Sequence, residues 1–267
     1  MYRFLLRPKW LVLHVVVLAL VITMINLGLW QLRRLHERQS FNSEVRAHLA
    51  QAPQPLDALL EKGSDPSSLE WRQVSVNGTY EADSQLLIRD RSLNSIPGFN
   101  VVTPLRLADG TFLVVVRGWV PGDVTATPAA PSGAVSLTGR LRVSQVRRHS
   151  WEKADPNDGV LDKMNRVDIA RIDQQVDGAA RAMYLEAATS DPSDESVTAI
   201  PEPVLSEGSH LSYTVQWFIF TLAALAGWVI AVQRHVAGQR KAELRDRRAA
   251  EKASADGSVT APELPSA

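Results

Sequence analysis

Residues 11–32 read LVLHVVVLALVITMINLGLWQL, and residues 211–232 read LSYTVQWFIFTLAALAGWVIAV. Each stretch is 22 residues long, with 17 apolar positions and no Asp, Glu, Lys or Arg. At about 1.5 Å rise per residue, each forms a helix long enough to cross a hydrocarbon core of roughly 30 Å. A buried helix of a soluble protein rarely has so long an uninterrupted apolar run, so the sequence predicts two membrane-spanning helices.

The first stretch follows Arg3, Arg7 and Lys9, as the apolar part of a cleaved signal peptide does. Its apolar run exceeds the roughly 7–15 residues of a signal peptide, no small-x-small cleavage site follows, and Arg33 and Arg34 close it. We therefore expect a retained anchor. Ten residues ahead of the helix leave no room for an organelle transit peptide, which favours a bacterial chain.

Charges beside the second stretch predict the orientation. Seven Lys and Arg residues follow it between residues 234 and 252, whereas residues 190–209 contain none. Because Lys and Arg accumulate on the cytoplasmic side, both termini are expected in the cytoplasm of a bacterial plasma membrane. Residues 1–10 then form a cytoplasmic N-terminus, residues 33–210 an extracytoplasmic domain, and residues 233–267 a basic and then disordered cytoplasmic tail.

Composition narrows the classes of function. The 29 Lys and Arg residues balance 29 Asp and Glu residues, but residues 39–208 alone carry 16 basic and 23 acidic residues, a net charge of −7. The zero net charge would exclude a generally basic nucleic-acid binder only if charge were spread evenly, and here the two ends together carry +7. The chain has no cysteine, which excludes disulfides, Cys-ligated metal clusters and a thiol nucleophile, and its six histidines show no HExxH motif or close ligand pair.

Between the two stretches, the hydrophobic period becomes that of β-strands. Alternating or short apolar runs predict strands near residues 74–80, 86–88, 99–107, 111–120, 135–146 and 182–187, with one short helix over residues 167–176. The expected architecture is two transmembrane α-helices flanking an extracytoplasmic β-rich domain, a barrel or sandwich of the α+β class. Residues 189–209, acidic and with three prolines, are expected to link this domain back to the membrane.

Five motifs, in this order between two spans, resemble those of the Surfeit locus protein 1 family, in a form like that of actinobacterial members. They are GLWQLR at residues 28–33, EWRQV at 70–74, PGF at 97–99 with RGWVP at 117–121, GR at 139–140, and HLSYTVQWF at 210–218. Residues 164–170 lack the aromatic residue of the corresponding family block, and the basic tail extends beyond what the family requires.

The resemblance implies a membrane assembly factor of the respiratory chain, and no enzyme. Its role would be to help haem a insertion into, or stabilisation of, the catalytic subunit of haem-copper cytochrome c oxidase. The expected partners are that subunit, other oxidase assembly factors and the lipid bilayer, but no nucleic acid. Family members are described as binding haem through a histidine at the start of the second helix, which here is His210, a candidate ligand of the haem iron.

The residues around His210 can be weighed by themselves. Tyr213 and Trp217 follow His210 at i+3 and i+7 on one helical face, and Trp30 and Gln31 should lie at the same level of the first helix. An imidazole at this depth can ligate haem iron while aromatic side chains pack against the macrocycle. The alternative interpretation is an interfacial belt, because Trp, Tyr and His favour the membrane boundary.

Four more residues are candidate partner contacts. Arg33 can pair with haem propionates or a partner subunit, or can act as a snorkelling anchor. Arg117, Gly118 and Trp119 end a very apolar strand, where core packing and a recognition surface both remain open. His14, the other intramembrane histidine, lies 18 residues before the end of the first stretch, so we expect it to pack helices and not to share a haem with His210.

Three other functions are alternatives to haem insertion: a scaffold, a hydrolase and a copper chaperone. A scaffold that holds oxidase subunits without touching haem fits every sequence feature equally well. A membrane-anchored Ser/Lys hydrolase would use Lys153 or Lys163 as base, but no GxSxG elbow is present. A copper chaperone would need Cys or clustered Met and His, and the four methionines are separated.

Overall fold

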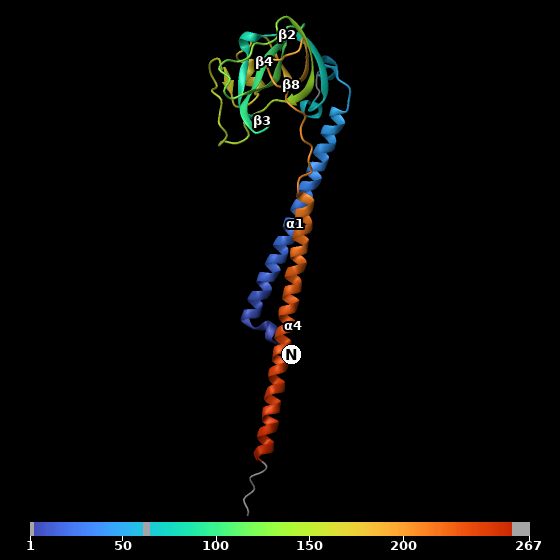
Figure 1. The fold of residues 1–267 in the computed structure, drawn as a ribbon, viewed down its shortest axis with the longest axis vertical. Helices are drawn as coiled ribbons and strands as arrows, with labels where there is room; N and C mark the ends of the chain where they lie inside the picture. Colours follow the sequence, from blue (N-terminus) through green and yellow to red (C-terminus); the bar gives the residue numbers. More distant parts are fainter. Residues whose placement is uncertain (1–2, 61–64, 258–267) are drawn as a thin grey trace, which may run out of the picture. The chain divides into compact units, whose positions relative to one another are not determined.

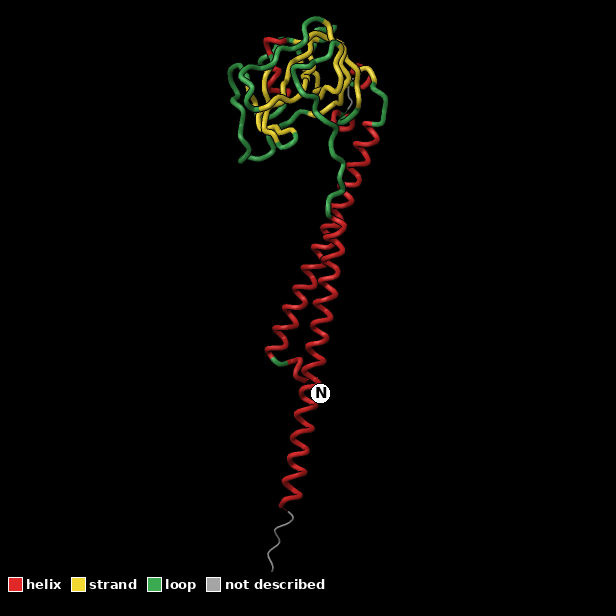
Figure 2. The backbone as a smooth tube through the Cα atoms, in the orientation of Figure 1, coloured by secondary structure: helices red, strands yellow, loops and turns green. Residues whose placement is uncertain are grey.

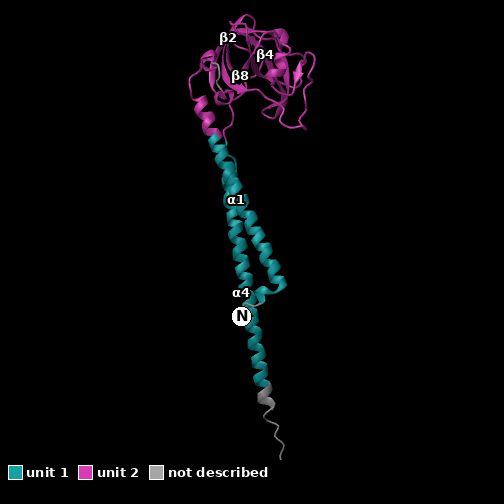
Figure 3. Cartoon of the chain, turned by 180° about the vertical axis from the view of Figure 1, so that it is seen from behind, with its two compact units in different colours: residues 1–40, 206–267 teal, residues 41–205 magenta. Residues whose placement is uncertain are grey.

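The computed structural model describes residues 3–60 and 65–257 (Figure 1). The chain divides into two compact units, one of residues 1–40 with 206–267 and one of residues 41–205 (Figure 3). In their described parts, the first unit is helical and the second consists mainly of strands and loops (Figure 2). Each unit has its own architecture.

The helical unit holds η1 (Arg3–Leu6) and two long helices, α1 (Pro8–Leu49) and α4 (His210–Gly257). Both long helices are apolar over a length that can cross a membrane. Large apolar side chains along them, such as Leu18, Ile22 and Leu222, are exposed and have no protein cover. Lipid is the solvent that makes this exposure favourable, so the chain is a membrane protein with two spans.

Both helices extend beyond the predicted spans. α1 continues to Leu49 because no Pro or Gly interrupts the polar residues after the apolar stretch, and Pro53 follows its end. α4 continues past residue 232 to Gly257, so the basic part of the expected tail is helical. The rest of that tail, residues 258–267, and residues 1–2 of the expected N-terminus lie outside the described residues.

In the helical unit, α1 and α4 pack closely at Gly28. A Cβ atom at Gly28 would lie 3.3 Å from the ring of Phe218, so the absent side chain lets the helices approach. Thr214 and Thr221 are buried on α4, and their hydroxyls donate to the carbonyls of His210 and Trp217, each over 2.9 Å. These bonds leave no hydroxyl proton unpaired in the apolar interface.

The second unit contains eight strands and several short helices. After α1 come β1 (Gln54–Pro55), α2 (Leu56–Leu59), η2 (Pro66–Leu69), β2 (Gln73–Tyr80), η3 (Ala82–Ser84), β3 (Leu86–Leu93), β4 (Ile96–Arg106), β5 (Phe112–Pro121), β6 (Ala134–Val143), β7 (Lys163–Met164), α3 (Ile169–Asp173) and β8 (Ala180–Asp191). The strand order is β1-β2-β6-β8-β5-β4-β3-β7, and β2 also pairs with β4. That pairing closes β2, β6, β8, β5 and β4 into a barrel, which decides between the barrel and the sandwich.

Strand β5 explains why the apolar run at residues 112–116 is continuous. Leu113 and Val115 belong to an apolar cluster that fills the barrel interior and contains residues of all five barrel strands. Phe112, Val114 and Val116 belong to a second cluster, built with β3, β7 and α3 on the outer face. Because both faces of β5 are buried, the strand shows no polar alternation.

The predicted strands are found, with differences at their ends. β3 runs on to Leu93, and the helix expected over residues 167–176 is shorter, from Ile169 to Asp173. The expected linker begins later than residue 189, because β8 reaches Asp191 and Thr198 pairs with Trp119 across two backbone hydrogen bonds. The second compact unit spans residues 41–205, and the expected extracytoplasmic bounds of 33–210 stay a prediction.

Candidate functional site

The candidate site lies at one end of the helix pair, where α4 begins. Nδ1 of His210 lies 2.8 Å from Oε1 of Gln31 on α1. An amide oxygen only accepts, so Nδ1 carries the imidazole proton and donates it to Gln31. In the tautomer with its proton on Nδ1, Nε2 carries the lone pair through which histidine binds metals when its other nitrogen is held in this way.

Gly208 lies beside the Nε2 side of the ring, just before the start of α4. Gly208, two residues before His210, has φ = +69°, and a Cβ atom there would lie 3.6 Å from Nε2. Glycine thus provides both the left-handed backbone and the space beside the ring. Ser209 opens the helix by accepting hydrogen bonds from the backbone N–H of Tyr213 at 3.1 Å and from the hydroxyl of Ser212 at 2.8 Å.

The other predicted site residues surround this pair without hydrogen-bonding to it. Tyr213 and Trp30 are 46% and 44% exposed. Trp217 is half-buried and meets Phe220 edge to face, with ring centroids 6.0 Å apart. The structure therefore brings Gln31 to His210 and leaves the aromatic residues on the surface of the helix pair.

Arg33 is exposed, and within the described chain it has no ion pair, whereas its neighbour Arg34 contacts Glu37 at 2.7 Å. A free guanidinium near the boundary suits either an anchor or a contact with an anionic group.

These residues fit haem held by a single protein ligand. His210 supplies one oriented imidazole, and apolar or aromatic residues supply the surface on which a macrocycle packs. Within residues 3–60 and 65–257, no three His, Asp or Glu side chains gather to hold a bare metal ion.

His14 lies at the far end of the helix pair. Its Nδ1 accepts a hydrogen bond from the indole N–H of Trp228 over 3.0 Å. Trp228 follows His210 by 18 residues, about 27 Å along α4, so His14 and His210 serve different ends of the pair. The bond joins α1 to α4, which is the helix-packing role expected for His14.

Sequence reasoning missed an aromatic cluster beyond His14. The ring of His235 lies 4.4 Å from Phe4 and 5.1 Å from Trp10, measured between centroids. Phe4, on η1, is buried by this contact. The i, i+4 spacing of Trp10 and His14 and the i, i+7 spacing of Trp228 and His235 are the signals that could have revealed it.

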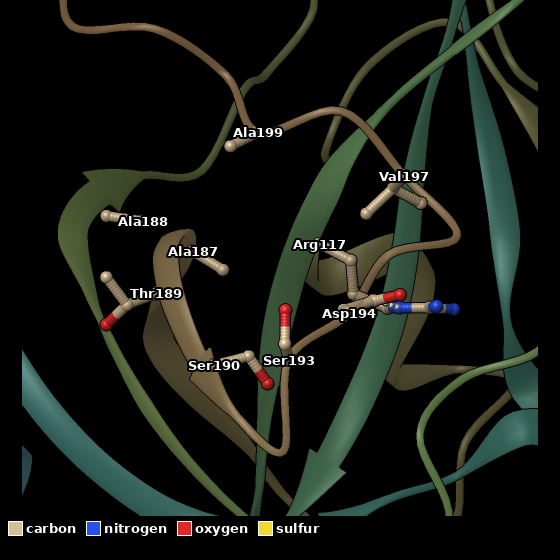
Figure 4. Close-up of a pocket in the computed structure, with 9 residues that line it drawn as sticks. All are labelled: Arg117, Ala187, Ala188, Thr189, Ser190, Ser193, Asp194, Val197 and Ala199. Carbon is tan, nitrogen blue, oxygen red and sulfur yellow. Dashed lines mark hydrogen bonds and ion pairs between the residues drawn. The ribbon is translucent and has the colours of Figure 1, made fainter.

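Arg117, Gly118 and Trp119 lie in the barrel unit and are packed into it. The guanidinium of Arg117 is fully buried and pairs with Asp194 at 2.8 Å, and it also donates to Gln85, Ser196 and the carbonyls of Pro128 and Ala129. Figure 4 shows Arg117 and Asp194 beside a pocket of about 280 Å³ that Thr189, Ser190 and Ser193 also line. Arg117 thus ties the 193–198 segment to β5.

The three residues are buried in the barrel unit, and their role as a recognition surface stays a prediction. Trp119 is 8% exposed, and a Cβ atom at Gly118 would lie 2.6 Å from the carbonyl oxygen of Thr198. Glycine is required at position 118 because the backbone at Thr198 passes directly against it, and Trp119 fills the space beside β3. Of the two roles left open, packing is the one that this geometry fits.

The ion pair of Arg117 also sets the charge of Asp194. Burial alone raises the pKa of this carboxyl, but hydrogen bonds from Arg117 and Ser196 outweigh it, so the pKa of Asp194 lies below its usual value. Burial raises the pKa of the neighbouring Tyr80 phenol, which stays neutral. The positive charge of Arg117 is therefore balanced by the negative charge of Asp194 inside the barrel unit.

Comparison with known proteins decides the family. The family model described as SURF1 family matches residues 18–222. The chain belongs to the SURF1 family. Uncharacterised SURF1-like proteins of Mycobacterium tuberculosis and Mycobacterium bovis are each 31% identical to it over 232 residues, which cover 84% of this chain and 83% of theirs. Human Surfeit locus protein 1 is 24% identical over 236 residues, which cover 80% of this chain and 75% of the human protein.

The SURF1 match includes the whole candidate site and stops before the tail. Gln31 and His210 both lie within residues 18–222, as does the complete barrel unit. The basic part of α4, between residues 234 and 252, lies outside the match. The family assignment therefore bears on the helix pair and the barrel, and the tail needs its own explanation.

Proposed function

We propose that this SURF1-family protein is a membrane assembly factor for haem-copper cytochrome c oxidase that binds haem a through His210 and presents it to the catalytic subunit. The observation that carries the proposal is the 2.8 Å hydrogen bond between His210 Nδ1 and Gln31 Oε1. This bond orients the ring of an interfacial histidine, which an interfacial belt would not require. Family membership supplies the link to the oxidase.

Each residue has a separate part in this proposal. His210 binds the haem iron through Nε2, and Gln31 is a positioning residue that holds the tautomer and the ring plane. Trp30, Tyr213 and Trp217 provide surface on which the macrocycle rests, and Arg33 pairs with a propionate. Haem a itself supplies the iron centre that the oxidase needs, and a single protein ligand on an exposed surface suits a group that must be passed on.

The test is an absorption spectrum of detergent-purified protein made in cells that synthesise haem a. We expect a haem a Soret band in the wild-type protein and its loss in His210→Ala. His36→Ala is the matched control, because His36 is an exposed histidine of the same helix pair. Gln31→Leu should keep the protein inserted in the membrane but shift the Soret band and weaken haem retention.

A haem-free scaffold predicts a different set of results. The wild-type protein would then copurify with oxidase subunits but show no Soret band, and His210→Ala would restore oxidase assembly in a strain lacking the protein. We expect instead that oxidase haem a content falls in that strain and that His210→Ala does not restore it. The same band in His210→Ala as in the wild type would reject His210 as the ligand.

A further inference from the structure

The part of α4 beyond the membrane-spanning stretch carries a basic stripe, which we define as Arg234, Lys241, Arg245, Arg248 and Lys252. All five residues are exposed, and none has an ion pair among those found in the described chain. Successive residues of an α-helix turn by about 100°, so these five positions fall within an arc of about 60° over about 27 Å of helix. The acidic residues Glu243, Asp246 and Glu251 lie about 90° or more from the centre of the arc.

The periodicity of the stripe requires a physical reason. Lys and Arg needed only to set membrane orientation can stand anywhere near the end of a span. Five cations stacked on one face repel one another, at a cost that spreading them around the helix would avoid. A long, narrow anionic partner that lies along this face would remove that cost.

Small residues flank the stripe. Ala237, Gly238 and Ala249 lie within about 70° of its centre, and a Cβ atom at Gly238 would meet nothing within 4 Å. Such residues let another helix approach to an interaxial distance of about 8 Å. The spacings of three, four and seven residues between the basic positions are those at which a second helix presents carboxylates on one face.

We propose that the basic stripe binds an acidic α-helix of a partner protein. The opposite charges would fix the register of the two helices, and the small residues would set their separation. This interaction goes beyond the proposed haem function, because the stripe lies outside the SURF1 match and about 36 Å along α4 from His210 at its nearest residue.

Two other anionic surfaces fit the stripe less well. α4 is unbroken to Gly257, so Lys252 lies about 30 Å along the helix beyond residue 232, the end of the membrane-spanning stretch. Attraction between Lys252 and anionic headgroups of that membrane is screened, because the distance is several times the Debye length of about 8 Å. For RNA, the segment from residue 234 to 252 offers no Phe, Tyr or Trp for base stacking, and its three acidic residues oppose a polyphosphate.

The test measures binding of a labelled helical peptide to the full-length protein in an uncharged detergent. The probe carries five glutamates at the spacing of the stripe in an Ala/Gln background, and its isomer has the same composition with the glutamates spread around the helix. The variant R245Q/R248Q removes two charges on the stripe, and R240Q/R247Q removes two from outside it. Circular dichroism checks that both variants keep their helix content.

We expect R245Q/R248Q to weaken binding of the probe about five- to tenfold and R240Q/R247Q to change it less than about twofold. The isomeric peptide should bind at least about tenfold more weakly than the probe. Equal losses of binding in the two variants, or equal binding of the two peptides, would overturn the proposal, because net charge alone would then explain the binding. Preferential binding of polyuridylate, or of mixed micelles that contain anionic phospholipid, at the same salt would overturn it in favour of those partners.

A photocrosslinker in living cells tests the same face with the natural partner. Placed at Ala249, beside the stripe, it should link to a protein segment whose carboxylates recur every three or four residues. Placed at Glu243, on the opposite face, it should not. Crosslinks to RNA or lipid at position 249, or equal crosslinking from the two positions, contradict the proposal.

Discussion

Single residues of the barrel unit hold distant segments together, and Arg117 is the clearest case. Its guanidinium has no exposed surface, and Asp194, its partner at 2.8 Å, is 9% exposed. Because Arg117→Met leaves that carboxylate buried and unpaired, we expect the free energy of unfolding to fall by about 3–5 kcal/mol. Urea unfolding of the detergent-solubilised protein, followed by near-ultraviolet circular dichroism, measures the change.

Arg181→Met is the control for this prediction. Arg181 also pairs with two carboxylates, Asp57 and Asp109, but their side chains are 79% and 48% exposed. Water can replace these exposed ion pairs, so the free energy of unfolding should fall by at most about 1 kcal/mol. Equal losses in the two variants would show that the burial of Arg117 contributes nothing.

Tyr184 gives the barrel unit an alkaline limit. Burial raises the pKa of its phenol from its usual value of 10.0 to about 12, although the charge of Arg142 lowers it. Tyr184 in the unfolded chain loses its proton first, so its contribution to stability is complete below pH 10 and is lost as the pH rises to about 12. Chemical unfolding from pH 8 upward should show this decline, and Tyr184→Phe should reduce its slope.

At the scale of helices, the contact between α1 and α4 depends on one glycine. Gly28→Leu would place atoms where the ring of Phe218 now lies 3.3 Å from the Cβ position. The helices must then separate, which should pull Gln31 away from His210. A cysteine pair at positions 31 and 210, joined by a short bifunctional thiol crosslinker, reports this, because those side chains now meet at 2.8 Å and the chain has no other cysteine.

We expect the yield of this crosslink to fall several-fold in Gly28→Leu. Gly227→Leu is the matched control: it lies in the apolar part of α4, and a Cβ atom there meets nothing within 4 Å. A normal yield in both variants would mean that Gly28 does not set the distance between the helices.

Elements differ in how far the sequence could predict them. Apolar length and period were sufficient for the two long helices and most strands, since these patterns are local. The level of Gln31 and His210 followed from their equal distance to one membrane boundary. The closure of the barrel, where Thr79 pairs with Arg106, could not be predicted from the sequence. The pairing of β2 with β4 involves only two residues of each strand and does not change the hydrophobic period of either.

The same limit explains why the sequence left two roles open for Arg117. Its partner Asp194 lies 77 residues away, in a segment whose prolines and acidic residues are typical of a linker. A buried arginine and an exposed recognition arginine look identical in sequence until the burying segment is placed. The bond between His14 and Trp228 joins positions 214 residues apart, and only the pairing of the two spans could reveal it.

For the whole molecule, the two units obtain their stability from different surroundings. The barrel unit buries two apolar clusters of its own and uses no disulfide, since the chain has no cysteine. The long helices instead expose most of their large apolar side chains and depend on lipid. Solubility without detergent should therefore be restored only by removing both helices, and not by removing either one.

Lys and Arg distribution also predicts on which side of the membrane each part of the chain lies. Single cysteines in this cysteine-free chain test it: Ser136→Cys lies on an exposed position of β6, and Ala249→Cys on an exposed position of α4. With both termini in the cytoplasm, a membrane-impermeant maleimide added to spheroplasts should label position 136 at once and position 249 only after lysis. Two spans place both ends of the chain on one side, so labelling of position 249 in intact spheroplasts, with position 136 protected, would reverse the orientation. Labelling of both positions would mean that only one of the helices crosses the membrane.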